Sequence, residues 1–265
     1  YQYSGDCTVM REIGRLREVS FRAVGEGTGH RRDVDAFDAY YDHIVLWDEN
    51  QLELVGAYRL KRIKDLAEGE TLYSESLFEY QIPYAEEYFE CGAELGRSFV
   101  QPRYWGRNGL DYLWQGLGTY LRRYPEVRYL FGPVSLSDSL PRGAKDLLIQ
   151  FYQTHFPTTQ PWAKANSPYR SELTETVFGG EDYRGEFATL KEQLATMGCS
   201  VPTLYKQYTE LCEDGGVSFT AFNVDPDFAD CIDGLVLVDI EKMKPARRKR
   251  YLGETSSAGQ QPKAA

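Results

Sequence analysis

The chain has 265 residues, of which 42% are hydrophobic, and a formal net charge of −10 at pH 7. This length suits one large domain or two small ones, and the apolar fraction is enough for a substantial core. The negative charge disfavours nucleic-acid binding, and no run approaches the roughly 18 apolar residues that a membrane-spanning helix needs.

Cysteine and histidine usage gives no sign of a metal centre or a disulfide framework. The five cysteines are scattered without a C-x-x-C pair, and the three histidines are dispersed. We therefore predict no metal and a reducing, cytoplasmic location. The sequence opens at Tyr1 and its first methionine is Met10, so we interpret the chain as a fragment whose upstream domain is missing. The small, polar segment 253–265 is predicted to be a disordered tail.

Hydrophobic periodicity predicts helices and strands that alternate along the chain. Residues 9–24 carry apolar side chains at helical spacing and stop at Gly25, so we expect a helix there. The next two segments, 43–48 and 52–60, flank a short polar turn as a strand pair would. Further strands are expected at 92–100, 128–136, 217–223 and 234–240, and further helices at 110–121, 141–153, 186–197 and 202–212. We predict one α/β domain over 1–252.

Two motif-like patterns are set aside. The glycines of GEGTG, residues 25–29, follow a helix where a nucleotide loop would follow a strand, so we interpret them as a helix C-cap. The His-x4-Asp spacing of glycerolipid acyltransferases occurs at His30–Asp35 and His43–Asp48. The second pair lies along a predicted strand, where a separation of five residues puts the side chains on opposite faces.

Charged residues near the first helix leave two interpretations open. The run DVDAFDAYYD is either a solvated turn or a set of carboxylates beside the first helix that binds a cationic amine. Arg22 either solubilises that helix or reaches a carboxylate in a cleft. The four carboxylates of the run are Asp33, Asp35, Asp38 and Asp42.

A Gly/Arg-rich turn, PRYWGRNG, joins the strand at 92–100 to the helix that follows it. A helix that begins after such a turn presents unpaired N–H groups and the positive end of its dipole. The turn is therefore either a simple connection or a cradle for a phosphate.

Ordered blocks along the chain resemble a known enzyme family. They are REIGRLREVSFRAVGEGTG, DVDAFDAYYDHIVLW, VGAYRL, ELGRSFV, YLFGPVSLS and FNVDPDFADCIDGLVLVDI. Over roughly residues 9–252 they resemble the acyl-carrier-protein-dependent ornithine and amino-acid N-acyltransferases of the GNAT superfamily, many of which are labelled hemolysins. A more distant resemblance is to acyl-homoserine-lactone synthases. The resemblance to the GNAT N-acyltransferases implies a GNAT-like mixed, mostly antiparallel sheet flanked by helices. In fused relatives, a glycerolipid acyltransferase domain precedes this one.

The same resemblance implies a donor site. In GNAT enzymes a Q/R-x-x-G-x-G/A loop after the fourth strand holds the phosphates of the acyl donor. Arg103, Gly106 and Arg107 lie in the matching loop, Asn108 stands where the last small residue is expected, and Gly109 follows. This departure is compatible with the acyl-phosphopantetheine of acyl carrier protein, which brings one phosphate where acyl-CoA brings a pyrophosphate.

Acyl transfer to an amine of pKa ~10 needs a proton acceptor. Glu94 is our candidate, and the alternative is that it is an exposed strand carboxylate. Arg97, the other catalytic candidate, points to the opposite face of a regular strand, so only a bulge would bring both into one cleft. By resemblance, Arg59 helps to bind the acceptor. The other candidates for substrate binding are Arg22, Asp35 and Asp38.

We therefore expect an N-acyltransferase that moves a fatty acyl group, 3-hydroxylated in part of the family, from acyl carrier protein to ornithine or another small amino acid. The product is a lyso-aminolipid. One alternative is a coenzyme-A-dependent acetyltransferase, and another is a non-catalytic carrier- or lipid-binding module. No permanently bound cofactor is expected.

The basic segment EKMKPARRKR, residues 241–250, is the last feature of note. It is either a solubilising tail or a patch, over 242–250, that docks an acidic carrier protein or an anionic membrane surface. The second interpretation would place the enzyme at the inner membrane face.

Overall fold

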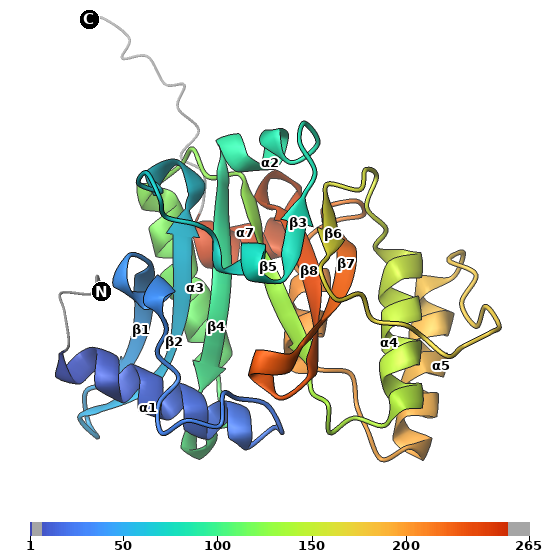
Figure 1. Ribbon diagram of the computed structural model, residues 1–265, viewed down its shortest axis with the longest axis horizontal. Helices are drawn as coiled ribbons and strands as arrows, with labels where there is room; N and C mark the ends of the chain where they lie inside the picture. Colours follow the sequence, from blue (N-terminus) through green and yellow to red (C-terminus); the bar gives the residue numbers. More distant parts are fainter. Residues whose placement is uncertain (2–6, 254–265) are drawn as a thin grey trace, which may run out of the picture.

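The computed structural model describes residue 1 and residues 7–253 (Figure 1). Six strands form a sheet in the order β1-β2-β4-β5-β8-β7, in which every pair is antiparallel except β4 and β5. A separate small sheet pairs β3 with β6. The strands are β1 (Asp42–Asp48), β2 (Glu53–Arg62), β3 (Phe78–Tyr80), β4 (Gly92–Val100), β5 (Tyr129–Leu136), β6 (Ala163–Ala165), β7 (Val217–Asp225) and β8 (Cys231–Asp239). The α/β class and the mostly antiparallel sheet are thus confirmed.

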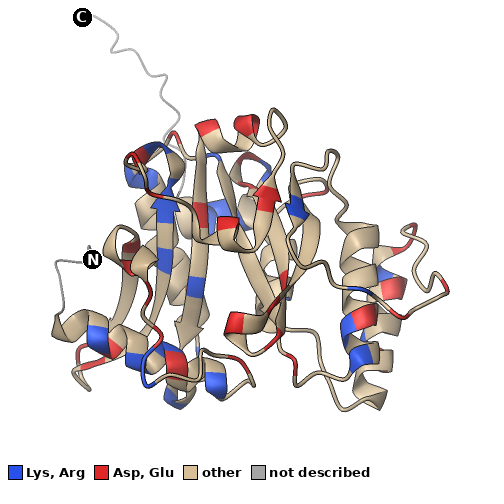
Figure 2. Cartoon of the chain, in the orientation of Figure 1, with Lys and Arg blue, Asp and Glu red and all other residues tan. Residues whose placement is uncertain are grey.

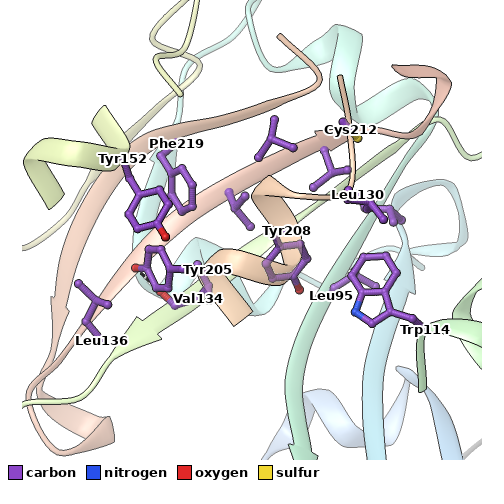
Figure 3. Close-up of a cluster of buried hydrophobic side chains, with 14 of the residues drawn as sticks. Leu95, Trp114, Leu130, Val134, Leu136, Tyr152, Tyr205, Tyr208, Cys212 and Phe219 are labelled. Atoms are coloured by element: carbon purple, nitrogen blue, oxygen red, sulfur yellow. Dashed lines mark hydrogen bonds between the residues drawn. The ribbon is translucent and has the colours of Figure 1, made fainter. Parts of the chain in front are cut away.

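Helices cover both faces of this sheet. Helix α1 packs Met10, Ile13 and Leu16 against β2 and β4 on one face, because these side chains recur at helical spacing. The main core, part of which is drawn in Figure 3, lies on the other face beneath α3, α4 and α6. The helices are α1 (Thr8–Arg22), α2 (Glu86–Glu90), α3 (Gly109–Arg123), α4 (Arg142–His155), α5 (Tyr183–Thr196), α6 (Thr203–Thr209) and α7 (Pro245–Leu252).

The basic segment at the end of the described chain forms helix α7, which packs on α3. Tyr251 is buried there, with its ring 5.8 Å from that of Trp114. Arg250 donates to both carboxylate oxygens of Asp111 on α3, at 2.7 and 2.5 Å. These residues are therefore part of the fold and not a free solubilising tail. The predicted tail at 253–265 lies outside the described residues except for Gly253.

Gly118 of α3 makes the contact with α7 possible, and replacing it should weaken the fold. A Cβ atom at this position would lie 2.0 Å from the Tyr251 carbonyl oxygen. We expect Gly118→Ala to lower the free energy of unfolding by ~1–3 kcal/mol, the usual cost of overpacking. Denaturant unfolding followed by circular dichroism measures this change.

Gly143→Ala is the matched control, because its Cβ would meet Met197 Sδ at an ordinary 3.6 Å. That variant should be neutral or more stable by up to ~1 kcal/mol, since alanine favours helices over glycine. Equal unfolding midpoints for the two variants would show that α7 does not need the close approach.

Candidate active site

The sheet opens between β4 and β5. The two strands pair in parallel only up to Glu94 and Phe131, and they separate beyond these residues. A pocket of about 50 Å³ lies in the opening, lined by residues 96–98 of β4 and 133–135 of β5. A ligand there would lie between strands of the sheet and not on its surface.

Side chains from both faces complete the pocket. On the main-core face, the Tyr58 and Tyr208 hydroxyls hydrogen-bond to each other at 2.5 Å, and Tyr208 belongs to α6 (Figure 3). On the face of α1, the walls include Tyr73, Phe228 and Asp233. The pocket therefore joins an aromatic end to an end that carries charge.

A β-bulge aims Arg97 at the charged end. Ala57 pairs with Phe99 and Arg59 pairs with Gly96, so β4 has one residue more than β2 in this interval. Arg97 lies in the bulge with φ of +48°, a conformation that residues other than glycine seldom adopt. The bulge that the sequence required for Arg97 to share a face with Glu94 is present.

Glu94 and Arg97 meet at Tyr73. The Glu94 carboxylate accepts hydrogen bonds from the Tyr41 hydroxyl and from the backbone N–H groups of Tyr73 and Ser74, the latter two at 3.0 and 2.8 Å. Arg97 donates to the Tyr73 hydroxyl at 3.0 Å. Glu94 is 1% exposed, so the interpretation of this residue as an exposed strand carboxylate is wrong. Burial raises the pKa of its carboxyl group. Glu94 does not line the pocket, but Tyr73, whose backbone N–H it accepts from, does.

Three carboxylates of the acidic run, Asp33, Asp35 and Asp38, form an ionic network and not a solvated turn. Asp42 lies apart on β1, where it accepts a hydrogen bond from the Tyr120 hydroxyl at 3.0 Å. Asp33 and Asp38 are each 1% exposed. Arg17 donates to both oxygens of Asp38 at 2.8 and 3.0 Å, and Arg59 donates to Asp35 and Asp38 at 2.6 and 3.1 Å. Burial alone would raise the pKa of Asp38, but the two guanidinium groups outweigh it and lower this pKa to about 2. Figure 2 shows basic positions on β2 and β4 and acidic positions in the segment that leads from α1 to β1.

Arg97 connects this network to the pocket. Its Nε lies 3.0 Å from Asp33, and its guanidinium lies over the rings of Tyr73 and Phe228. Arg59 remains fully buried behind Tyr73 and does not reach the pocket. All the candidate catalytic and substrate-binding residues lie in the described part of the chain, and of these candidates Arg97 alone lines the pocket.

Arg22 lies away from this cluster. Its side chain is 53% exposed, and it pairs with Glu18 and donates to the His30 carbonyl oxygen, both at 2.6 Å. The arginine of α1 that reaches a carboxylate of the acidic run is Arg17, four residues after Ile13 on the apolar face. That spacing was the available signal for its burial.

The predicted phosphate cradle connects the end of β4 to α3. Gly106 has φ of +73°, and a Cβ there would meet no atom within 4 Å. Asn108 is the N-cap residue of α3 without a side-chain cap, and Gly109 is the first residue of the helix. The first backbone N–H groups of α3 therefore lack a side-chain acceptor, as a phosphate site requires.

The two arginines of the loop contact neighbouring side chains. Arg103 pairs with Glu53 at 2.8 Å, and the Arg107 guanidinium lies over the Tyr104 ring. Arg107, Asn108 and Gly109 line a hollow of about 450 Å³ between this loop and the β1–β2 turn. The loop thus faces open space on the side where α3 begins.

Replacing Gly106 tests the cradle. We expect Gly106→Val to weaken binding of the acyl donor about tenfold or more, because a branched side chain obstructs the approach of a phosphate to the backbone. Stability should fall by only ~1–2 kcal/mol, the cost of φ > 0 for valine. Titration of the donor and thermal unfolding measure the two effects.

Gly198→Val is the control, since Gly198 has φ of +71° and equally open surroundings. It should lose the same stability and keep donor affinity. If both variants bind donor equally well, the turn is only a connection.

Comparison with known proteins places the chain in a family. Residues 16–115 match the acetyltransferase (GNAT) domain. The glycine N(alpha)-acyltransferase of Bacteroides thetaiotaomicron is 30% identical over 262 residues, which cover 92% of this chain and 77% of that protein. The chain belongs to the GNAT N-acyltransferases. An L-ornithine N(alpha)-acyltransferase of Brucella abortus is 27% identical to this enzyme, over 94% of this chain and 93% of its own length.

Solved structures with a related arrangement include a CoA-dependent acyl-homoserine lactone synthase. It is 12% identical to this N-acyltransferase, with a TM-score of 0.37 over 86% of this chain and 77% of its own. The protein TofI gives a TM-score of 0.43 at 11% identity, over 90% and 92%. Within the described residues of the N-acyltransferase, no helix is long and apolar enough to cross a membrane.

Proposed function

We propose that the enzyme transfers a fatty acyl group from the thioester of acyl carrier protein to the α-amine of an amino acid, glycine or ornithine, and so makes a lyso-aminolipid. The observation that carries this proposal is the opening between β4 and β5, because Arg97 lines its pocket and β4, which forms one wall, continues into the cradle loop. The names of the relatives support the choice of acceptor.

The donor would bind with its phosphate at the N–H groups of Gly106 to Gly109 and its thioester in the opening. The amine nitrogen then attacks the thioester carbonyl carbon, a C–N bond forms, and the C–S bond breaks. Arg97 would orient the carboxylate of the amino acid, since its guanidinium lies at the pocket wall. The Tyr58–Tyr208 hydroxyl pair lies at the other wall, within the same opening.

One experiment separates this proposal from its alternatives. The protein is incubated with acyl carrier protein or coenzyme A carrying acyl chains of matched length, together with glycine or ornithine, and products are identified by mass spectrometry. We expect long-chain N-acyl amino acids from the carrier-protein donors. Preference for acetyl-CoA would make it an acetyltransferase, and donor binding without turnover would make it a binding module.

Docking of a carrier protein or an anionic membrane on residues 242–250 stays a prediction. The structure shows that part of the charge of this segment is already compensated within the fold. Arg247 lies 3.5 Å from Glu210, and Arg250 pairs with Asp111 at 2.5 Å. A partner would therefore meet a weaker field than the composition of the segment suggests.

A further inference from the structure

A buried carboxylate on β8 lacks the partners that buried carboxylates normally have. Asp233 is 5% exposed and lies in a strand that is otherwise apolar at most positions and buried throughout. Among the described residues, its one hydrogen-bond donor is the Cys231 thiol, a weak donor 3.7 Å from Oδ2. Since Asp233 lines the pocket between β4 and β5, the missing partner has room only on the pocket side.

Two further carboxylates converge on the same end of the pocket. Glu26, in the loop after α1, accepts a hydrogen bond at 2.9 Å from Ser135, the residue that pairs with Asp233 across β5 and β8. Asp225 is buried on β7 and accepts from the Tyr73 hydroxyl at 3.3 Å. Asp233 therefore lines this end of the pocket, and the other two carboxyl groups each accept a hydrogen bond from a residue that lines it.

The positive charge nearby does not balance them. Arg97 lines the pocket, but it is already paired with Asp33 at 3.0 Å. The titratable and charged groups that surround Asp233 come from different elements and are Glu26, Tyr73, Arg97, Tyr205, Asp225 and Cys231. The pocket is thus prepared for a small cation that enters with the substrate.

We propose that Asp233 binds the ammonium group of the amino-acid acceptor and takes its proton before acyl transfer. The inference rests on the proposed N-acyl transfer and deepens it. One proton passes from the nitrogen to the Asp233 carboxylate, and the free amine attacks the thioester carbon. As the C–S bond breaks, the sulfur leaves and receives the second proton that the nitrogen loses, so that the products are an amide and a thiol.

The local chemistry suits a base that works near neutral pH. Burial, together with Asp225 and Glu26, raises the pKa of Asp233 to about 8, and burial raises the pKa of Glu26 to about 7. A base is most effective when its pKa lies near the working pH. Glu94, in contrast, already accepts three hydrogen bonds and lies outside the pocket.

The test compares Asp233→Asn with wild type in N-acylation of glycine and of ornithine by palmitoyl-loaded acyl carrier protein, from pH 6 to 10. We expect kcat/KM for the acceptor to fall about a hundredfold at pH 7. The loss should shrink to below tenfold at pH 10, where free amine is abundant, and donor affinity should not change. A pH profile like that of wild type would overturn the inference.

Two further variants keep the test decisive. Glu26→Gln removes a negative charge beside Asp233 and should shift the acidic limb of the wild-type profile to lower pH, whereas an unshifted limb counts against the inference. Asp239→Asn changes another buried aspartate of β8, one that pairs with Arg128, and should leave the profile unchanged. Failure of the wild-type enzyme to acylate any amino acid would instead reject the proposed function itself.

Discussion

Replacing Asp38 with asparagine is expected to lower the free energy of unfolding by about 3–5 kcal/mol. Asp38 accepts hydrogen bonds from Arg17 and Arg59, and the side chains of all three residues are at most 1% exposed. Asparagine keeps the shape of the side chain but leaves two buried guanidinium groups short of negative charge. Chemical denaturation of the two proteins measures the difference.

The stability that Asp38 contributes to the fold depends on pH. The folded-state pKa of Asp38 is about 2, below its ordinary value of 3.8. The stability that ionised Asp38 contributes is therefore present above pH ~4 and is lost as the pH falls through 2. Asp38→Asn should lack this acid-sensitive component.

The control is Glu12→Gln, which breaks the exposed pair with Arg15 on the outer side of α1. A surface pair of this kind contributes about 0–1 kcal/mol. If Asp38→Asn costs no more than this control, the acidic run is not a structural network.

Glu94→Gln is expected to reduce kcat/KM by about a hundredfold, by a similar factor at every pH. Glutamine cannot accept hydrogen bonds at both terminal atoms, so it leaves the Tyr73 or the Ser74 N–H without a partner. That loss costs about 1–3 kcal/mol, and it releases the segment that holds Tyr73 against Arg97. A loss of 2.7 kcal/mol in transition-state stabilisation is a hundredfold in rate.

The pH profile separates this positioning role from the role predicted from the sequence. If Glu94 is the base, activity of Glu94→Gln should recover at high pH, where free amine is abundant. Glu79→Gln, on an exposed position of β3, should behave as wild type. Near-normal activity of Glu94→Gln itself would exclude both roles.

The larger elements could be predicted because each carries its own periodic pattern. Met10, Ile13 and Leu16 repeat at helical spacing, and the structure places α1 where this pattern lies. The short elements α2, β3 and β6 span only three to five residues, too few for a period. β3 depends on pairing with β6, which follows it by more than eighty residues, so no local signal marks either strand.

The sequence could relate Glu94 to Arg97, because they lie three residues apart on one strand and a bulge puts them on one face. It carried no sign that the acidic run, more than fifty residues earlier, meets this strand around Tyr73. Asp233 was not singled out, although an aspartate within CIDGLVLVD is unusual for a buried strand. The loop after α1 was interpreted as a C-cap, and its Glu26 approaches Asp233 only because the fold places it beside Ser135 of β5.

The separation of β4 from β5 gives the sheet two inner edges in addition to its two outer ones. Beyond Glu94 and Phe131, the facing N–H and C=O groups of these strands have no strand partner among the described residues, and they border the pocket. An extended chain containing amide groups can bond to such edges as an added strand does. The donor arm would then be held largely by the main chain. Because main-chain groups are common to all residues, side chains around the opening are free to determine which acyl group and which amine the enzyme accepts.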